Sequence, residues 1–183
     1  MQTLALELKK IPTWVKDTAL VIGASILIAL SAHFAIPFKP VPLVLQGSLI
    51  LVLSVLLGKK RAPAAVALFL AQGAAGLAVF PPGLLGLARF VGPTGGYLLG
   101  YLIASYVVGK VLEMLGQRTL TKAFLAMVAG NAIIFLFGAA WLSSFVGGVK
   151  QALLLGVIPF ILIDLLKLTL GLKVLQWIGW VKR

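Results

Sequence analysis

The sequence predicts an all-α integral membrane protein with six transmembrane helices and with both termini in the cytoplasm. Three observations support this prediction: the composition, the recurrence of long charge-free runs and the distribution of basic residues. Of 183 residues, 61% are hydrophobic, and the mean hydropathy is +1.13. Both values lie far outside the range of soluble globular domains.

A helix needs about 20 apolar residues to cross the hydrocarbon core of a bilayer. Charge-free runs that recur along the chain have about that length: 18–38, 40–58, 62–88, 90–109 and 123–149. A sixth run, 151–172, reaches it only if Asp164 and Lys167 are tolerated inside the membrane. We therefore expect helices at 18–38, 41–58, 62–80, 94–115, 121–147 and 151–176 in a single domain, 1–183.

The basic residues are distributed unevenly between the two sides of this arrangement. The formal net charge is +12, and twelve of the sixteen Lys and Arg residues fall on the side of the termini. Only Lys39, Arg89 and Lys150 fall on the other side. The positive-inside rule then places both termini in the cytoplasm. The basicity is thus explained by topology, with anionic membrane lipid as a partner and no nucleic acid.

The reactive residue types are scarce. The sequence has no cysteine, one histidine and four acidic residues. It therefore offers no disulfide framework, no thiolate or histidine-cluster metal site, and no paired carboxylates for acid–base catalysis. These counts argue against an intramembrane enzyme and against a bound metal.

Asp164 and Lys167 are the main candidate functional residues. They lie three positions apart in an otherwise apolar run, so they share one face of a helix. Ionisable groups inside a membrane are expensive and usually serve a ligand or an ion path. The alternative is an intrahelical ion pair that neutralises itself. Pro159, five residues before Asp164, predicts a kink that opens a pocket.

Three further candidates lie near the outer face. Gln46 follows a Pro-rich connection and can bind a ligand or bridge two helices. Thr94 is a predicted N-cap in GPTGGY, where a helix N-terminus favours an anion. Arg89 can bind an anion with two parallel hydrogen bonds, or it can contact lipid headgroups.

Other polar or aromatic residues have less decisive positions. Trp141 can stack on a ligand ring or belong to the interfacial aromatic belt. Gln72 is either a packing bridge or a ligand contact, and for Asn131 helix packing is the favoured interpretation. The segment from 81 to 96 is rich in proline and glycine, so it is expected to form a loop that either covers a cavity or lies in the interface.

An ordered set of motifs resembles the BioY family, the biotin-specific S-components of energy-coupling factor (ECF) transporters. The motifs are PVPLVLQG, QGAAGLAVF, GPTGGYLLGY, GNAIIFLFGAAWL and PFILIDLLK, and they extend from Val41 to Lys167. The resemblance implies an ECF S-component-like fold that binds biotin from outside, without a cofactor. It also implies association with an EcfT-like transmembrane subunit and ABC-type ATPases.

The resemblance assigns substrate-binding roles to particular residues. Asp164 and Lys167 match the D-x-x-K of the family, and Tyr97 belongs to GPTGGY. Asp164 would accept a ureido N–H of biotin, while Tyr97, Gln46 and Thr94 would complete the hydrogen bonds. Trp141 would help to enclose the thioether ring, and Arg89, Lys39 or the helix start at Thr94 would hold the carboxylate. The competing hypothesis is a stand-alone ion-coupled carrier that uses Asp164 as its proton or sodium site.

Overall fold

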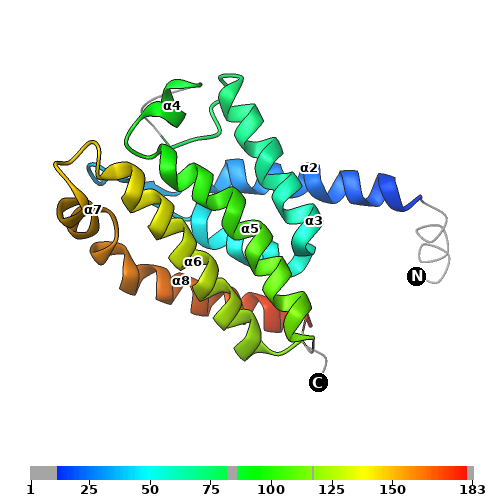
Figure 1. Cartoon of the computed structure of the whole chain (residues 1–183). Helices are drawn as coiled ribbons and strands as arrows, with labels where there is room; N and C mark the ends of the chain where they lie inside the picture. The colour runs from blue at the N-terminus through cyan, green and yellow to red at the C-terminus, as the bar shows by residue number, and fades with distance from the viewer. Residues whose placement is uncertain (1–11, 82–85, 117, 181–183) are drawn as a thin grey trace.

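The computed structural model describes residues 12–81, 86–116 and 118–180, which form a helical bundle with one small hairpin (Figure 1). The helices are α2 (Thr13–Ser31), α3 (Gln46–Ala74), α4 (Ala88–Val91), α5 (Gly95–Leu115), α6 (Leu120–Leu142), α7 (Val149–Gly156) and α8 (Ile158–Trp177). The hairpin pairs β1 (Ala35–Ile36) with β2 (Leu43–Val44) in antiparallel fashion.

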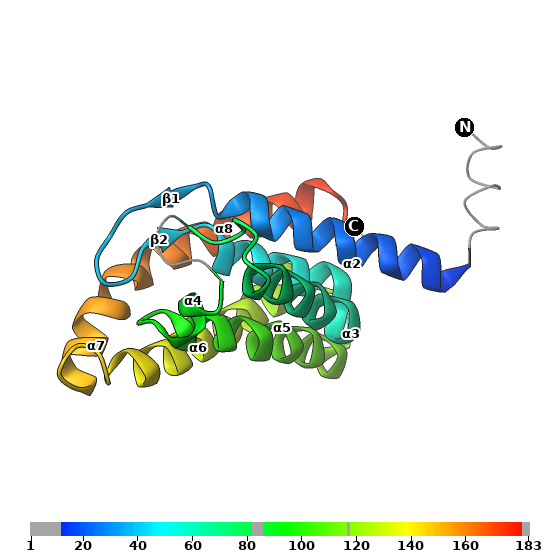
Figure 2. The same cartoon turned by 90° about the horizontal axis from the view of Figure 1, so that it is seen from above.

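The prediction of a helical membrane protein is confirmed, whereas the count of six spans is not. Within the described residues, α2, α5 and α6 are each long and apolar enough to cross a membrane. The pair α7 and α8, which is bent by 40°, counts as a fourth span when its helices are taken together. The N-terminal end of α2 extends beyond the other helices (Figures 1 and 2).

The first helix is shorter than predicted. The expected helix at 18–38 begins earlier, at Thr13, and ends at Ser31. Beyond Ser31 the chain turns and enters the hairpin, in which Ala35 is paired with Val44. The prolines at 37, 40 and 42 lack a backbone N–H and cannot continue a helical ladder, although the segment is apolar enough for a span.

The second and third predicted helices are two arms of α3. The arms start later and end earlier than predicted, at Gln46 and Ala74, and no connecting loop separates them. The chain bends at Gly58, whose φ of 74° lies in the left-handed region that glycine adopts without strain. The expected loop at Lys59–Arg61 is therefore the first turn of the second arm (Figure 1).

Small residues let α5 pack closely on α6. A Cβ atom at Gly96 would clash with the carbonyl oxygen of Phe137, and one at Gly100 would lie 2.9 Å from Cα of Ile134. The two glycines are four residues apart and thus share one face of α5. Small residues at this spacing allow helix backbones to approach in a membrane, where van der Waals packing drives association.

The last two predicted spans differ from the structure at their ends. Helix α6 ends at Leu142 rather than at 147. The predicted helix at 151–176 is divided into α7 and α8 at Val157, and Pro159 lies in the first turn of α8. The predicted kink is confirmed by the 40° bend between α7 and α8. A proline is accepted in the first turn of a helix, where its missing N–H needs no partner.

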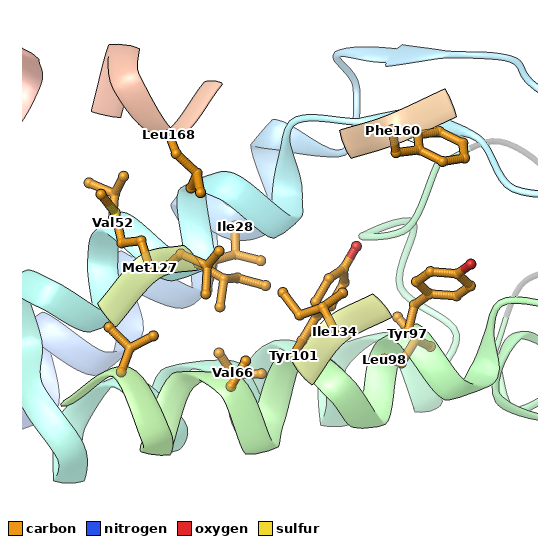
Figure 3. Packing of buried hydrophobic residues seen from close by; sticks show 14 of the residues in the cluster. Ile28, Val52, Val66, Tyr97, Leu98, Tyr101, Met127, Ile134, Phe160 and Leu168 are labelled. Atoms are coloured by element: carbon orange, nitrogen blue, oxygen red, sulfur yellow. The ribbon is translucent and has the colours of Figure 1, made fainter. Parts of the chain in front are cut away.

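The core lies where α2, α3, α5, α6 and α8 meet. Figure 3 shows buried side chains from all five helices, with Ile28, Val52, Met127 and Leu168 packed together on one side of the view. At the other side, the rings of Tyr97 and Tyr101 extend from α5 towards the segment of α8 that carries Phe160. The functional candidates gather at this second end.

Candidate functional site

Two adjoining cavities lie between the hairpin and the helices. The first is lined by Val41, Pro42, Val44, Gly47, Tyr97, Tyr101, Asn131, Ile134, Phe135, Gly156, Phe160, Asp164 and Lys167. The second is lined by Val41, Pro42, Val44, Gln46, Phe80, Pro81, Arg89, Thr94, Tyr97, Leu98 and Tyr101. Each has a volume of about 40 Å³, which is room for about three water molecules.

The two cavities share one dividing wall. Val41, Pro42 and Val44 of the hairpin segment line both cavities, as do Tyr97 and Tyr101 of α5. In the view from above, the hairpin lies alongside α8 (Figure 2). Phe38 at its tip meets Phe160 of α8 edge to face, with ring centroids 6.3 Å apart. Six of the seven predicted site residues line this pair of cavities.

Asp164 and Lys167 form the polar end of the first cavity. The Nζ atom of Lys167 lies 2.6 Å from Oδ1 of Asp164, and it also donates to the carbonyl oxygen of Val44 at 2.9 Å. The two side chains are 14% and 13% exposed, respectively. The predicted self-neutralising pair is therefore present, and it faces a cavity at the same time. Through Val44, the pair also connects α8 to the hairpin.

Asn131 and Tyr101 also line the first cavity, although the sequence did not single them out as site residues. Asn131 shares a face of α6 with Ile134 and Phe135, since the spacing is i, i+3 and i+4. Tyr101 follows Tyr97 by one helical turn and packs on Gly47, where a Cβ atom would lie 3.4 Å from its Cε1. The four-residue spacing of Tyr97 and Tyr101 could have identified Tyr101 as a cavity residue from the sequence. The inward orientation of Asn131, in contrast, depends on how α6 packs.

Tyr97 has a structural partner. Its hydroxyl donates to the carbonyl oxygen of Gly156 at 2.8 Å, at the end of α7. A Cβ atom at Gly138 or at Gly156 would clash with the Tyr97 side chain, so both positions leave room for it. Tyr97 therefore fixes the position of the break between α7 and α8, and its oxygen can still accept a hydrogen bond.

Arg89 is the charged group of the second cavity. It is 8% exposed, and its Nε is a buried nitrogen without a hydrogen-bond partner among the described residues. Its Cζ lies 6.0 Å from the centre of the Phe80 ring, which also packs edge to face on Phe69 and Phe90. Burial lowers the pKa of the Arg89 guanidinium from its usual value. An arginine nevertheless stays protonated in proteins, so a cation faces this cavity.

Gln46 and Thr94 also line the second cavity. Gln46 is 2% exposed, and its Nε2 donates to the carbonyl oxygens of Ile28 and Val79 at 3.4 and 3.2 Å. These bonds hold the start of α3 against the end of α2 and against the loop after α3. Thr94 occupies the N-cap position of α5, where its side chain makes no capping hydrogen bond. Of the proline- and glycine-rich segment 81–96, Pro81, Arg89 and Thr94 line this cavity.

Three candidates lie elsewhere. Trp141 lines neither cavity; its indole N–H donates to the carbonyl oxygen of Gly92 at 2.9 Å, beside the start of α5. Lys39 is exposed in the hairpin turn. Gln72 accepts a hydrogen bond of 3.0 Å from Ser25, which makes it a bridge between α3 and α2.

The charge balance of the cavities is simple. The Asp164–Lys167 pair is neutral as a whole, so Arg89 gives the lining a net charge of +1. A buried, unpaired guanidinium is costly unless an anion accepts its hydrogen bonds. The helical fold, the apolar spans and these cavities define a multi-pass membrane protein with a mainly apolar interior compartment that carries a few polar groups.

Comparison with known proteins identifies the family. The model of the BioY family matches residues 1–179, and the chain belongs to this family. The "Biotin transporter BioY" of Thermotoga maritima is 36% identical over 145 residues, which cover 79% of this chain and 85% of that protein. The "Probable biotin transporter BioY" of Pyrococcus horikoshii is 34% identical, with 83% and 89% covered.

A solved structure supports the same assignment. The crystal structure of the S-component for biotin from an ECF-type ABC transporter matches with a TM-score of 0.81. It is 27% identical to this chain, and the match covers 90% of each. The family is one of transporters, which confirms the prediction that the chain is not an enzyme.

Proposed function

We propose that this chain is the biotin-binding S-component of an ECF-type transporter in the cell membrane. Its similarity to the biotin transporters of Thermotoga maritima and Pyrococcus horikoshii and to the solved S-component for biotin supports this assignment. The structural observation that supports the assignment to biotin is the position of two sets of polar groups. The neutral Asp164–Lys167 pair and the cationic Arg89 line adjoining cavities.

The ureido ring of biotin is the part that suits the first cavity. It carries two N–H donors and one carbonyl acceptor in an otherwise apolar bicycle. The carboxylate of Asp164 accepts a ureido N–H, and Lys167 balances its charge. The Tyr97 oxygen is a further acceptor, while Phe160 and Ile134 pack on the apolar faces of the rings.

The valerate carboxylate of biotin is the part that suits the second cavity. Arg89 is the donor that this carboxylate needs, and the buried Nε without a partner among the described residues supports the assignment. Thr94 and Gln46 line the same cavity and supply polar contacts. Lys39 and Trp141 are not part of the proposed biotin site.

The cavities are too small for the ligand as they stand, because small-molecule sites usually measure roughly 300 Å³ or more. We infer that the hairpin segment from 35 to 44 shifts outward when biotin enters. This segment lines both cavities, and its contacts with α8 are the Lys167–Val44 hydrogen bond and the Phe38–Phe160 ring pair. The loop with Phe80 and Pro81 covers the second cavity only.

The remaining parts of the proposal concern topology and partners. The two arms of α3, together with the apolar segments that flank them, would act as separate spans, so that α2, both arms, α5, α6 and the bent pair α7–α8 would make six. The positive-inside distribution then places both termini in the cytoplasm. An EcfT-like subunit and two ABC-type ATPases would use ATP to drive release of biotin into the cell.

Two measurements test this proposal. Calorimetry on the purified protein in detergent should show saturable binding of biotin, and its absence would refute the assignment. Reconstitution of the chain alone in liposomes tests the competing carrier hypothesis. We expect no biotin uptake under an imposed proton or sodium gradient, because the carboxylate of Asp164 is already neutralised by Lys167.

A further inference from the structure

Asn131 lines the first cavity from the middle of α6. It is 7% exposed and shares the cavity with Asp164 and Lys167. The neighbouring cavity residues on the same face of α6, Ile134 and Phe135, are apolar. Side chains cover the backbone of a helix, so the amide of Asn131 is the polar group that α6 presents to the cavity.

The amide of Asn131 needs a partner. Within the part of the chain that the structure describes, its side chain makes no hydrogen bond to another residue. Among the described residues the fully buried side-chain atom without a partner is Nε of Arg89, so the Asn131 amide is reached from the cavity that it lines. An occupant of the cavity is the partner that this position allows.

Two of the other donors in the cavity have partners, whereas the Tyr101 hydroxyl makes no hydrogen bond among the described residues. Lys167 donates to Asp164 and to the carbonyl oxygen of Val44, and Tyr97 donates to the carbonyl oxygen of Gly156. Asp164 accepts the hydrogen bond from Lys167 through its Oδ1. Asn131 is thus the group in this cavity whose two N–H donors are both uncommitted among the described residues.

We propose that Asn131 determines specificity for a cyclic urea, by donating to the ureido carbonyl while Asp164 accepts a ureido N–H. This inference rests on the proposed function. An acceptor beside a donor is complementary to the N–H and C=O groups of a urea, which point in different directions from the ring. A site that hydrogen-bonds a ligand group discriminates strongly against an analogue that lacks that group.

The analogue 2-iminobiotin tests this inference, because it carries a guanidinium in place of the urea. At neutral pH its exocyclic nitrogen is a cationic donor, to which Asn131 can offer only its amide oxygen. We expect Asn131→Asp to reverse the preference, since a carboxylate accepts from that nitrogen and repels the ureido carbonyl. Asn131→Ala removes the donor to the ureido carbonyl, and we expect the Kd for biotin to rise at least tenfold.

The measurement is competition binding of both ligands to the purified full-length protein. Gln72→Glu is the matched control, because it is also an amide-to-carboxylate change but lies at the Ser25 bridge, outside both cavities. If a folded Asn131→Ala variant keeps the Kd for biotin within threefold of the wild type, the inference is wrong. An equal shift in Gln72→Glu would also overturn it. Asn131→Asp adds a charge in a buried position, so if it does not fold, Asn131→Ala decides.

Failure of this inference is distinct from failure of the proposed function. A wild-type protein that does not bind biotin contradicts the proposed function itself. A wild-type protein that binds biotin, together with Asn131 variants of unchanged affinity and ligand preference, contradicts only the role of Asn131.

Discussion

The ammonium group of Lys167 lies 2.6 Å from a carboxylate oxygen of Asp164, one helical turn earlier on α8. The same ammonium donates to the carbonyl oxygen of Val44 in the hairpin. One buried cation thus connects the ion pair to the segment that divides the two cavities. The pair thus supports the hairpin through Val44 and also lines the first cavity. Single and double variants of the pair separate these two roles.

The first prediction concerns this pair. Asp164→Asn and Lys167→Met each leave one buried charge without its partner, which costs about 3–5 kcal/mol. We expect each single variant to lower both the thermal unfolding midpoint and the affinity for biotin. The double variant removes both charges, so its stability should return towards that of the wild type while its affinity stays low. Thermal unfolding in detergent and calorimetry provide the two measurements.

Gln72→Ala is the control for the ion-pair series. Gln72 bonds to Ser25 and lies outside both cavities, so its loss should change the affinity only mildly. If the double variant binds biotin as tightly as the wild type, the pair has a structural role alone.

The second prediction concerns the charge of the ligand. Arg89→Gln removes the buried cation of the second cavity, and a hydrogen bond to a charged group contributes about 1.5–3 kcal/mol. We therefore expect the affinity for biotin to fall by about 10- to 100-fold. The affinity for the uncharged amide of biotin should change much less. Lys39→Gln, which removes an exposed cation in the hairpin turn, should leave both affinities unchanged.

The third prediction concerns the size of the first cavity. Gly47 lines it beside Tyr101, and a Cβ atom at Gly47 would make ordinary contact with that ring. The further atoms of Gly47→Leu would extend into the cavity and compete with the ligand. We expect a reduction in affinity of at least about tenfold, since misfit in a packed site costs about 1–3 kcal/mol. Gly23→Leu, on an open face of α2, should bind normally.

The fourth prediction concerns the contact between α3 and α5. A Cβ atom at Gly109 would clash with the backbone of Lys59, just after the bend at Gly58. Gly109→Ala must therefore separate the two helices, and we expect a loss of about 1–3 kcal/mol of unfolding free energy. Gly23→Ala adds the same methyl group where no atom lies within 4 Å, and it should be neutral or stabilising. Equal midpoints for the two variants would contradict this account.

The sequence was informative where a residue type conflicts with its surroundings. Asp164 and Lys167 stand out because charges are costly in an apolar run, and both line a cavity. Pro159 predicts the break in the last span for a similar reason, because its ring is incompatible with the helix interior. The start of α5 beside Thr94 follows from glycine and proline punctuation.

Tertiary packing decided the remaining features. The apolar run after Ser31 is compatible with a helix in lipid, and the hairpin forms because prolines interrupt the ladder. The basic cluster after Gly58 predicts a loop, yet one glycine with positive φ makes the bend in its place. The inward position of Asn131 and the separate position of Trp141 depend on helix rotation, which hydropathy does not specify.

The shared wall of the two cavities has a consequence for the shape of the cargo. A molecule that occupies both compartments must pass between the hairpin backbone and the rings of Tyr97 and Tyr101. The portion that crosses this constriction has to be slender and unbranched, as a chain of methylene groups is. Bulky substituents midway along an otherwise acceptable vitamin would exclude it by steric overlap, whatever the chemistry of its two ends.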